Sequence, residues 1–319
     1  MKKYLFLLAV IQLLILVNVA ISQTGKPQYT IRTEQNGADF GAFTIELFPL
    51  IAPLHSAYFD SLVNISFFDS TAFHRVVPGF VIQGGDPNSK NKPRETWGEG
   101  DPSQATILAE FSGVSHLRGI IGAARDVDIN SASSQFYVNV ADNESLDSQY
   151  TAFGRVVSGM DIVDKIVSVL RDANDNPIDK IEMFVTKGES TNLVTTTPEL
   201  VYPSDNGVGI IVGDTLKWNS SEDAVEFTIQ ISKNESFDTL YLNSKVGNNF
   251  HRIKFLELGN IKYFWRVKAN NGRNESDFSI PKSFFSSIKA PVLLTPKMNE
   301  DSVSVTPMLE WMPVEGTTR

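Results

Sequence analysis

An arginine and a glutamine, Arg75 and Gln83, stand in an otherwise largely apolar stretch, FHRVVPGFVIQGGD, at positions 73–86. A guanidinium is always charged and presents several N–H donors, and a glutamine amide can both donate and accept. Two interpretations are open at this point. Either the two side chains form a satisfied polar pair in a core, or they lie in an apolar pocket where both can bind an amide group.

The alternation of a β-strand predicts which side chains of this stretch share a face. In a regular strand Phe73 and Arg75 point to one side and His74 to the other. A turn is expected at Pro78-Gly79. Beyond it two side chains are expected on each face, Val81 and Gln83 on one, Phe80 and Ile82 on the other.

The surrounding sequence alternates apolar and polar residues in short runs, which is typical of strands with one buried face. Strands are expected at 29–33, 41–48, 119–125, 134–140, 153–159 and 180–186. Two helices are expected, one opened by Pro53 and one from Met160 to Val169. The apolar stripe of the first comprises Leu54, Ala57, Tyr58 and Leu62. Many short strands with two helices predict a mainly β fold, a closed barrel capped at its ends.

The pattern Phe-His-Arg-x-x-x-Gly-Phe-x-x-Gln-Gly-Gly-Asp resembles the signature of the cyclophilins, the peptidyl-prolyl isomerases. Later segments also resemble this family: Ala109-Glu110-Phe111, Ser134-Gln135-Phe136, Leu146-Asp147, Phe153-Gly154 and Gly159-Met160. The resemblance covers about half of the chain and implies a cyclophilin-like isomerase domain over 27–189. It also implies an eight-stranded barrel with two capping helices, whose active face lies on the outside.

Carried over position by position, the resemblance implies two catalytic residues, Arg75 as the donor to the substrate amide and Gln83 as a residue that grips the peptide. It implies a wall around the proline ring and a grip on the peptide, formed by Phe80, Val81, Ala124, Arg125, Gln135, Tyr137, Leu146 and Tyr150. Gln135 is expected to orient Arg75. His74 matches a family position but is expected to be structural, because its side chain faces away from Arg75.

Several positions depart from the family's usual residues. Val81, Tyr137 and Arg125 stand where methionine, phenylalanine and asparagine are common, which affects substrate preference rather than fold. Ser145 stands where members that bind cyclosporin tightly have a tryptophan. Weak cyclosporin binding is therefore expected.

Composition excludes several classes of partner. The 319 residues carry a net charge of −9 and contain no basic block longer than Lys2-Lys3, which argues against nucleic acid. Cysteine is absent and the four histidines lack ligand-like spacing, so no metal and no cofactor are expected.

The N-terminus has the pattern of a signal peptide. Lys2-Lys3 precedes a nearly unbroken apolar run from Tyr4 to Ile21, with small residues before Gln23. Residues 1–22 are expected to be removed. An uncleaved anchor is the alternative, since about 18 apolar residues can just span a bilayer. In either case the rest of the chain is expected outside the cytoplasm, periplasmic or secreted.

The second half contains an internal repeat. Pro198, Leu200, Pro203, Leu216 and Trp218 recur 93 residues later as Pro291, Leu293, Pro296, Leu309 and Trp311. A Thr-rich linker is expected at 190–197, a β-sandwich at 198–287 and the start of a second, incomplete repeat at 290–319. The segment YFWRVKA from Tyr263 resembles the sixth strand of fibronectin type III domains, with Tyr263 as a candidate tyrosine corner.

The expected function is peptidyl-prolyl isomerisation of proline-containing, exported polypeptides during their folding. The alternative is a weakly active or non-catalytic binding protein, in which barrel and sandwich together hold client proteins or a surface polymer. A protein or polymer ligand for the sandwich is expected in either case. The intact set of Arg75, Phe80 and Gln83 favours the enzyme.

Overall fold

The structure is a computed structural model that describes residues 28–188, 195–219, 221, 223–257, 259–287, 293–295, 306 and 308–312. The expected signal peptide and residues 190–194 of the expected linker lie outside the described residues. None of the helices in the described part of the chain is long and apolar enough to cross a membrane.

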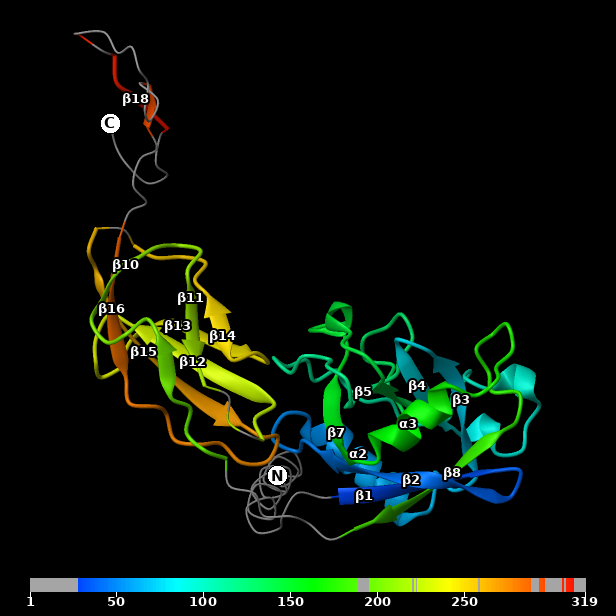
Figure 1. The fold of residues 1–319 in the computed structure, drawn as a ribbon. Coiled ribbons are helices and arrows are strands. Elements are labelled where there is room, and N and C mark those ends of the chain that lie inside the picture. Colours follow the sequence, from blue (N-terminus) through cyan, green and yellow to red (C-terminus); the bar gives the residue numbers. More distant parts are fainter. Residues whose placement is uncertain are drawn as a thin grey trace, which may run out of the picture.

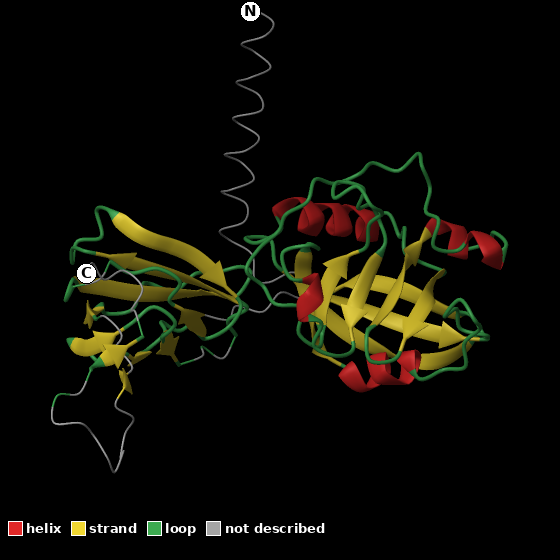
Figure 2. Cartoon of the chain, turned by 90° about the horizontal axis from the view of Figure 1, so that it is seen from above, coloured by secondary structure: helices red, strands yellow, loops and turns green. Residues whose placement is uncertain are grey.

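The first half of the chain forms the expected closed barrel of eight strands (Figures 1 and 2). Around the barrel the strands follow the order β1-β2-β7-β5-β6-β4-β3-β8. They are β1 (Gln28–Gln35), β2 (Ala38–Leu47), β3 (Thr71–Val77), β4 (Val81–Asp86), β5 (Ile120–Ala123), β6 (Phe136–Asn139), β7 (Ala152–Ser158) and β8 (Ile181–Lys187). Figure 2 shows helices on opposite sides of this barrel; they are α2 (Pro53–Asn64) and α3 (Met160–Val167). The cyclophilin-like, mainly β architecture is confirmed.

Local sequence explains how the barrel begins and what fills it. β1 and β2 are joined by Asn36-Gly37, both with positive φ, as a tight hairpin turn requires. Alternate side chains of the strands then point inward and form one apolar core, with rings that meet edge to face such as Phe68 and Phe136. This filled apolar interior leaves the outer surface to carry any site.

The helix at Pro53 is present, but two of the four residues predicted for its stripe are wrong; Leu62 is buried and Tyr58 half-buried as expected. Leu54 and Ala57 are exposed, while His55, Ser56, Phe59, Leu62 and Val63 are buried. A histidine can take an inward position here because its Nδ1 lies 2.7 Å from the Glu110 carboxylate. The same carboxylate accepts the backbone N–H groups of Leu54 and His55, at 2.9 and 3.0 Å, and so caps the helix from a distant loop.

The predicted faces of the 73–86 stretch need two corrections, and the first concerns β3. Phe73 pairs with Gly84 and Arg75 with Gln83, so His74 is an extra residue, a β-bulge. Phe73 therefore lies in the barrel core while Arg75 points outward, contrary to the expectation that they share a face.

The second correction concerns Phe80. Ile82 lies in the core, and Val81 and Gln83 share the outer face as expected. Phe80 precedes β4 and belongs to the turn, so strand alternation does not apply to it. Its ring lines the outer face as well.

The second half forms two further sheets around a core of their own, and we call residues 195–287 the C-terminal β-domain. One sheet has the order β10-β16-β15-β12-β13 and the other β14-β11-β9. The strands are β9 (Leu200–Tyr202), β10 (Gly207–Ile210), β11 (Thr215–Trp218), β12 (Glu226–Ser232), β13 (Leu240–Val246), β14 (Phe250–Arg252), β15 (Lys262–Asn270) and β16 (Lys282–Ser286). Trp218 from one sheet and Trp265 from the other are fully buried, with ring centroids 6.4 Å apart.

The repeat has a structural counterpart. Leu200 pairs with Trp218 across β9 and β11, and Leu293 pairs with Trp311 across β17 (Leu293–Thr295) and β18 (Glu310–Trp311). Trp218 is 1% exposed, whereas Trp311 is 57% exposed. The second copy thus repeats the first strand pairing, without a surrounding core among the described residues.

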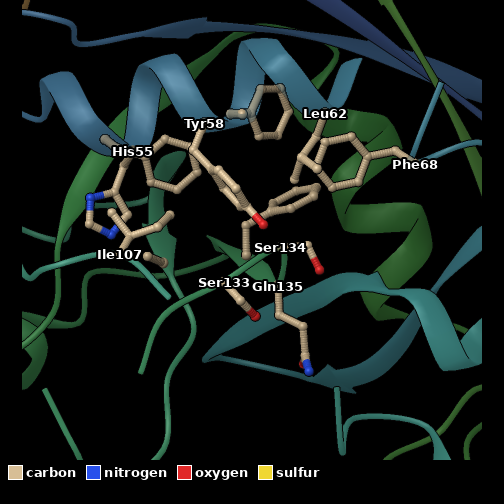
Figure 3. A pocket seen from close by; sticks show the side chains of 12 residues that line it. His55, Tyr58, Leu62, Phe68, Ile107, Ser133, Ser134 and Gln135 are labelled. Carbon is tan, nitrogen blue, oxygen red and sulfur yellow. The ribbon is translucent and has the colours of Figure 1, made fainter. Parts of the chain in front are cut away.

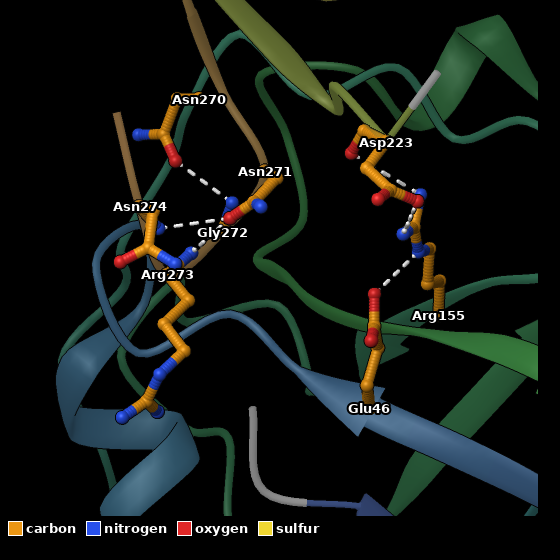
Figure 4. A network of polar contacts seen from close by, with 8 residues as sticks. All are labelled: Glu46, Arg155, Asp223, Asn270, Asn271, Gly272, Arg273 and Asn274. Atoms are coloured by element: carbon orange, nitrogen blue, oxygen red, sulfur yellow. Dashed lines mark hydrogen bonds and ion pairs between the residues drawn. The ribbon is translucent and has the colours of Figure 1, made fainter. Parts of the chain in front are cut away.

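The barrel and the C-terminal β-domain are in direct contact. Arg155 of β7 donates to the buried Glu46 of β2 at 2.6 Å and to Asp223 at 3.3 Å (Figure 4). Nearby, the backbone N–H of Leu50 donates to Gly272 O at 2.9 Å. A small apolar cluster joins the two parts, made of Phe48, Ile51, Val114, Ile120, Ala152 and Val225.

Candidate active site

A pocket of about 180 Å³ lies on the outer face of the barrel beside β4 and β6. It is lined by Arg75, Phe80, Val81, Gln83, Ala124, Arg125, Tyr137, Leu146 and Tyr150. All nine are residues that the sequence placed at a site, although they span 76 positions of the chain. We call this pocket the proline slot, because the resemblance implies that it receives a proline ring.

Arg75 is positioned by the bulge in β3. It lies directly opposite Gln83 on β4, and its guanidinium carbon is 5.9 Å from the centroid of the Phe80 ring. Within the described residues, the Arg75 guanidinium has neither a hydrogen bond nor an ion pair. A fixed cation is therefore available to a ligand at the mouth of an apolar slot.

Gln83 is held in place by a short chain of amides. Gln135 Oε1 accepts from Gln83 Nε2 at 3.0 Å, and Gln135 Nε2 donates to Gly98 O at 3.0 Å. The resemblance implied that Gln135 orients Arg75. The hydrogen bonds of Gln135 go instead to Gln83, the residue opposite Arg75, and to the 87–104 loop, so this long loop supports the site.

Arg125 forms part of the wall. Its guanidinium donates to the carbonyl oxygens of Asp126 and Gln149, at 2.7 and 3.0 Å, and lies 4.4 Å from the Tyr150 ring centroid. These contacts fix the Arg125 side chain against the rim. Its role at the slot is therefore different from that of Arg75, whose donors are free to turn to a ligand.

Tyr137 is the large side chain at the base of the slot, and it is 5% exposed. Burial raises its pKa above the ordinary value for tyrosine, so the hydroxyl stays protonated. His116 stacks on its ring with centroids 6.1 Å apart, and Tyr150 meets it edge to face at 6.0 Å. Neither His116 nor Gly122, which lies under this ring, was predicted as part of the site.

His74 lies under the 87–104 loop, 3% exposed, where an added Cβ on Gly98 would meet its ring at 3.4 Å. Burial lowers the pKa of His74 to about 4, against an opposing effect of the Asp86 charge. A neutral, enclosed imidazole is consistent with a structural role. It does not line the slot.

Two further hollows adjoin this region. One, of about 440 Å³, shares Gln83, Ala124, Arg125 and Gln135 with the site and carries the acidic residues Glu99, Asp101 and Asp126. The other, under α2, holds about 10 Å³, which is space for about one water molecule. Figure 3 shows that rings from α2 point into it, with Gln135 at its edge. Only the first hollow can extend a ligand site.

Among the described residues, no three of the histidine, aspartate and glutamate side chains gather as a cation would require. The site offers a cation, amide donors and acceptors, and an apolar slot.

Comparison with known proteins assigns the barrel. Residues 29–187 match the family model described as cyclophilin type peptidyl-prolyl cis-trans isomerase. The chain is 41% identical over 137 residues to a peptidyl-prolyl cis-trans isomerase of Acinetobacter baylyi, covering 41% of this chain and 69% of that protein. It is 31% identical over 162 residues to one of Arabidopsis thaliana, covering 50% of this chain and 93% of that protein.

A solved structure of a Cryptosporidium parvum cyclophilin type isomerase, in the presence of dipeptide ala-pro, aligns with a TM-score of 0.44 and 25% identity, covering 51% of this chain and 99% of that one. The family model falls on the barrel, in which the slot lies. The chain belongs to the cyclophilin family and is a peptidyl-prolyl cis-trans isomerase.

Proposed function

We propose that the isomerase reaction takes place in the proline slot, with Arg75 as the donor to the substrate amide. The observation that carries this proposal is the free guanidinium of Arg75 opposite Gln83, at the mouth of an apolar pocket. Phe80, Val81, Tyr137 and Leu146 surround the proline ring. Gln83 and the backbone around Arg125 hold the peptide, with Ala124 beneath the residue before the proline.

Rotation about an X–Pro bond breaks amide resonance, with a barrier of about 18–20 kcal/mol. As the amide twists, its nitrogen becomes pyramidal and regains a lone pair. A guanidinium N–H aimed at that lone pair stabilises the twisted state more than the planar one, which is what lowers the barrier. No proton needs to be transferred.

A hydrogen bond from a charged donor contributes about 1.5–3 kcal/mol, which is roughly 10- to 150-fold in rate. Arg75 therefore accounts for part of the acceleration. The remainder comes from holding the ring in the slot and from moving the amide out of water, since the twisted amide is less polar than the planar one.

The test is cis–trans exchange in a short X–Pro peptide, measured by NMR. Arg75→Ala should reduce kcat/KM at least about tenfold while the circular dichroism spectrum stays native-like. Arg75→Lys should also be poor, because an ammonium does not reproduce the guanidinium fork. Arg32→Ala, a 45% exposed arginine on β1, is the matched control. Full activity of both Arg75 variants would remove Arg75 from the mechanism.

We propose further that the protein acts on polypeptides outside the cytoplasm. The support is the sequence alone: Lys2-Lys3 and the apolar run to Ile21. Exported material should begin at Gln23, which intact mass will show. A mass that retains residues 1–22 would favour a membrane anchor instead.

We propose that the C-terminal β-domain is a fibronectin type III-like module that holds a protein or surface polymer near the slot. Tyr263, at the start of β15, supports this assignment. Its hydroxyl accepts the backbone N–H of Glu257, six residues upstream, at 3.0 Å, as in a tyrosine corner. Direct binding of the exported chain to cell-surface polymer, compared with a barrel-only relative, tests the second part. Equal binding by the two proteins would exclude such a role.

A further inference from the structure

Residues Gly113–His116, which we call the bridging segment, belong to the barrel half of the chain but contact the C-terminal β-domain. Glu226 of β12 is fully buried, and its Oε1 accepts the Gly113 N–H at 2.9 Å. Its Oε2 lies 2.9 Å from Lys245 Nζ. A buried carboxylate with both a charged partner and a backbone donor is held in one position.

The backbone of the bridging segment packs directly against the backbone of residues 245–247 in the β-domain. A Cβ added to Gly113 would lie 2.7 Å from the carbonyl carbon of Lys245. A Cβ added to Gly247 would lie 2.6 Å from Gly113 O and from Ser115 N. Val114 is 2% exposed and belongs to the apolar cluster that joins the two parts. The β-domain thus fixes this segment closely.

The other end of the segment reaches the slot. His116 is fully buried, and both its backbone N–H and its Nδ1 bond to Asp147 Oδ1, at 2.7 and 3.0 Å. Its ring stacks on Tyr137, and Asp147 is adjacent to Leu146. Two slot residues, Tyr137 and Leu146, are therefore placed in part by His116.

A third slot residue depends on the same segment. His116 O accepts the Asn143 N–H at 2.8 Å, and Asn143 Nδ2 donates to Phe80 O at 2.9 Å. The bridging segment thus connects the β-domain to three residues of the slot, Phe80, Tyr137 and Leu146. This connection from the β-domain to the slot runs through the buried Glu226 carboxylate, the bridging segment, and the hydrogen bonds of His116 and Asn143.

We propose that the C-terminal β-domain sets the shape of the proline slot through the bridging segment, with Glu226 and His116 as positioning residues. Neither touches the substrate. This inference rests on the slot being the isomerase site. It assigns to the β-domain a part in the reaction itself, in addition to any ligand that the domain holds.

The experiment compares three variants of the full chain. Glu226→Ala removes the acceptor for Gly113, Glu226→Gln keeps that acceptor but loses the charge opposite Lys245, and Glu257→Ala alters an exposed ion pair with Lys233 on the same domain. Glu226→Ala should raise KM for an X–Pro peptide about threefold to tenfold, with a smaller change in kcat. Glu226→Gln and Glu257→Ala should leave KM within about twofold.

A second readout separates positioning from loss of stability. The His116 ring signals in NMR report its stacking on Tyr137, and they should shift in Glu226→Ala but not in Glu226→Gln. Unchanged KM and unchanged His116 signals in a folded Glu226→Ala protein would overturn the proposal. An effect of Glu226→Gln equal to that of Glu226→Ala would also contradict it, because lost charge would then be the cause.

Gly247→Ala provides an independent route if Glu226→Ala does not fold. The new methyl group must displace Gly113 and Ser115, whereas the control Gly188→Ala meets its nearest atom at 3.6 Å. Gly247→Ala should raise KM and shift the His116 signals, and Gly188→Ala should do neither. An inactive unmodified protein would refute the proposed function, while an active one with unaltered KM in Gly247→Ala would refute this inference alone.

Discussion

The ring of Tyr137 lies over Gly122, its cross-strand neighbour on β5. The two residues are paired in the sheet, and a Cβ added to Gly122 would come within 2.2 Å of both Cζ and the hydroxyl oxygen of Tyr137. Only glycine leaves room for a tyrosine ring in this position. The base of the slot therefore depends on a residue that has no side chain.

Gly122→Ala is expected to impair the slot. The methyl group forces the Tyr137 ring away from β5, so kcat/KM for an X–Pro peptide should fall about tenfold or more. The double variant with Tyr137→Phe should recover part of this loss, because the hydroxyl is one of the clashing atoms. Exchange NMR measures the rates, with Gly188→Ala as the control. Unaltered turnover in Gly122→Ala would show that the position of Tyr137 is unimportant.

His74 predicts a pH dependence of stability. The folded protein binds a proton at His74 only near pH 4, whereas the unfolded chain binds it near pH 6.5. The unfolded state is thus favoured as the pH falls from 6.5 to 4. At pH 4.5 the free energy of unfolding should be lower by about 2–3 kcal/mol from this group alone.

Urea denaturation at pH 7 and pH 4.5 measures this effect when unmodified protein and His74→Gln are compared. The variant lacks the titrating group, so the difference between the two pH values should shrink by about 2–3 kcal/mol. Turnover per folded molecule should be retained, since His74 does not line the slot. A folded but inactive variant would make His74 part of the reaction.

Arg155 is expected to be the main electrostatic contact between the barrel and the β-domain. It is the ion-pair partner of Glu46, which is 1% exposed, and it also reaches Asp223. Arg155→Met should lower the free energy of unfolding by about 2–4 kcal/mol, because the buried Glu46 carboxylate loses a charged partner. Arg171→Ala breaks an exposed pair and should cost less than about 1 kcal/mol. If Arg155→Met and Arg171→Ala lowered the free energy of unfolding equally in urea denaturation, burial of the Glu46 pair would not explain its strength.

The barrel could be predicted because its signals are local. Alternation predicted the strands, and the fourteen-residue signature contains four of the nine slot residues, Arg75, Phe80, Val81 and Gln83. What could not be predicted depends on contacts between distant residues. The bulge at His74 places Phe73 and Arg75 on opposite faces of the sheet. It is visible only in the pairing of β3 with β4.

The supports of the site were missed for a similar reason. His116 stands alone between Ser115 and Leu117, with no ligand-like spacing. Its importance arises from Asp147 and Tyr137, more than 20 positions away. Likewise, the Thr-rich segment predicted a linker at 190–197. Its last residues contact the rest of the β-domain: Thr195 Oγ1 donates to Asn274 O, and Thr196 O accepts from Ser221 Oγ.

Ser145 lies beside the slot, exposed in the short helix Glu144–Leu146, and its carbonyl oxygen accepts Gln149 Nε2 at 2.8 Å. The next residue, Leu146, lines the slot. A residue at position 145 can therefore contact a ligand that extends beyond the proline ring. The resemblance to the cyclophilins implies that members which bind cyclosporin tightly have a tryptophan at this position.

We expect an active isomerase with weak cyclosporin sensitivity. Serine has little apolar area and a short reach, so the loss of an indole contact and its hydrogen bond should cost about 2–4 kcal/mol, or roughly 30- to 1000-fold in affinity. Ser145→Trp should restore much of the binding while turnover of a short peptide changes little. One inhibition titration on both proteins measures this. Nanomolar inhibition of the unmodified enzyme would show that position 145 does not govern cyclosporin binding in this chain.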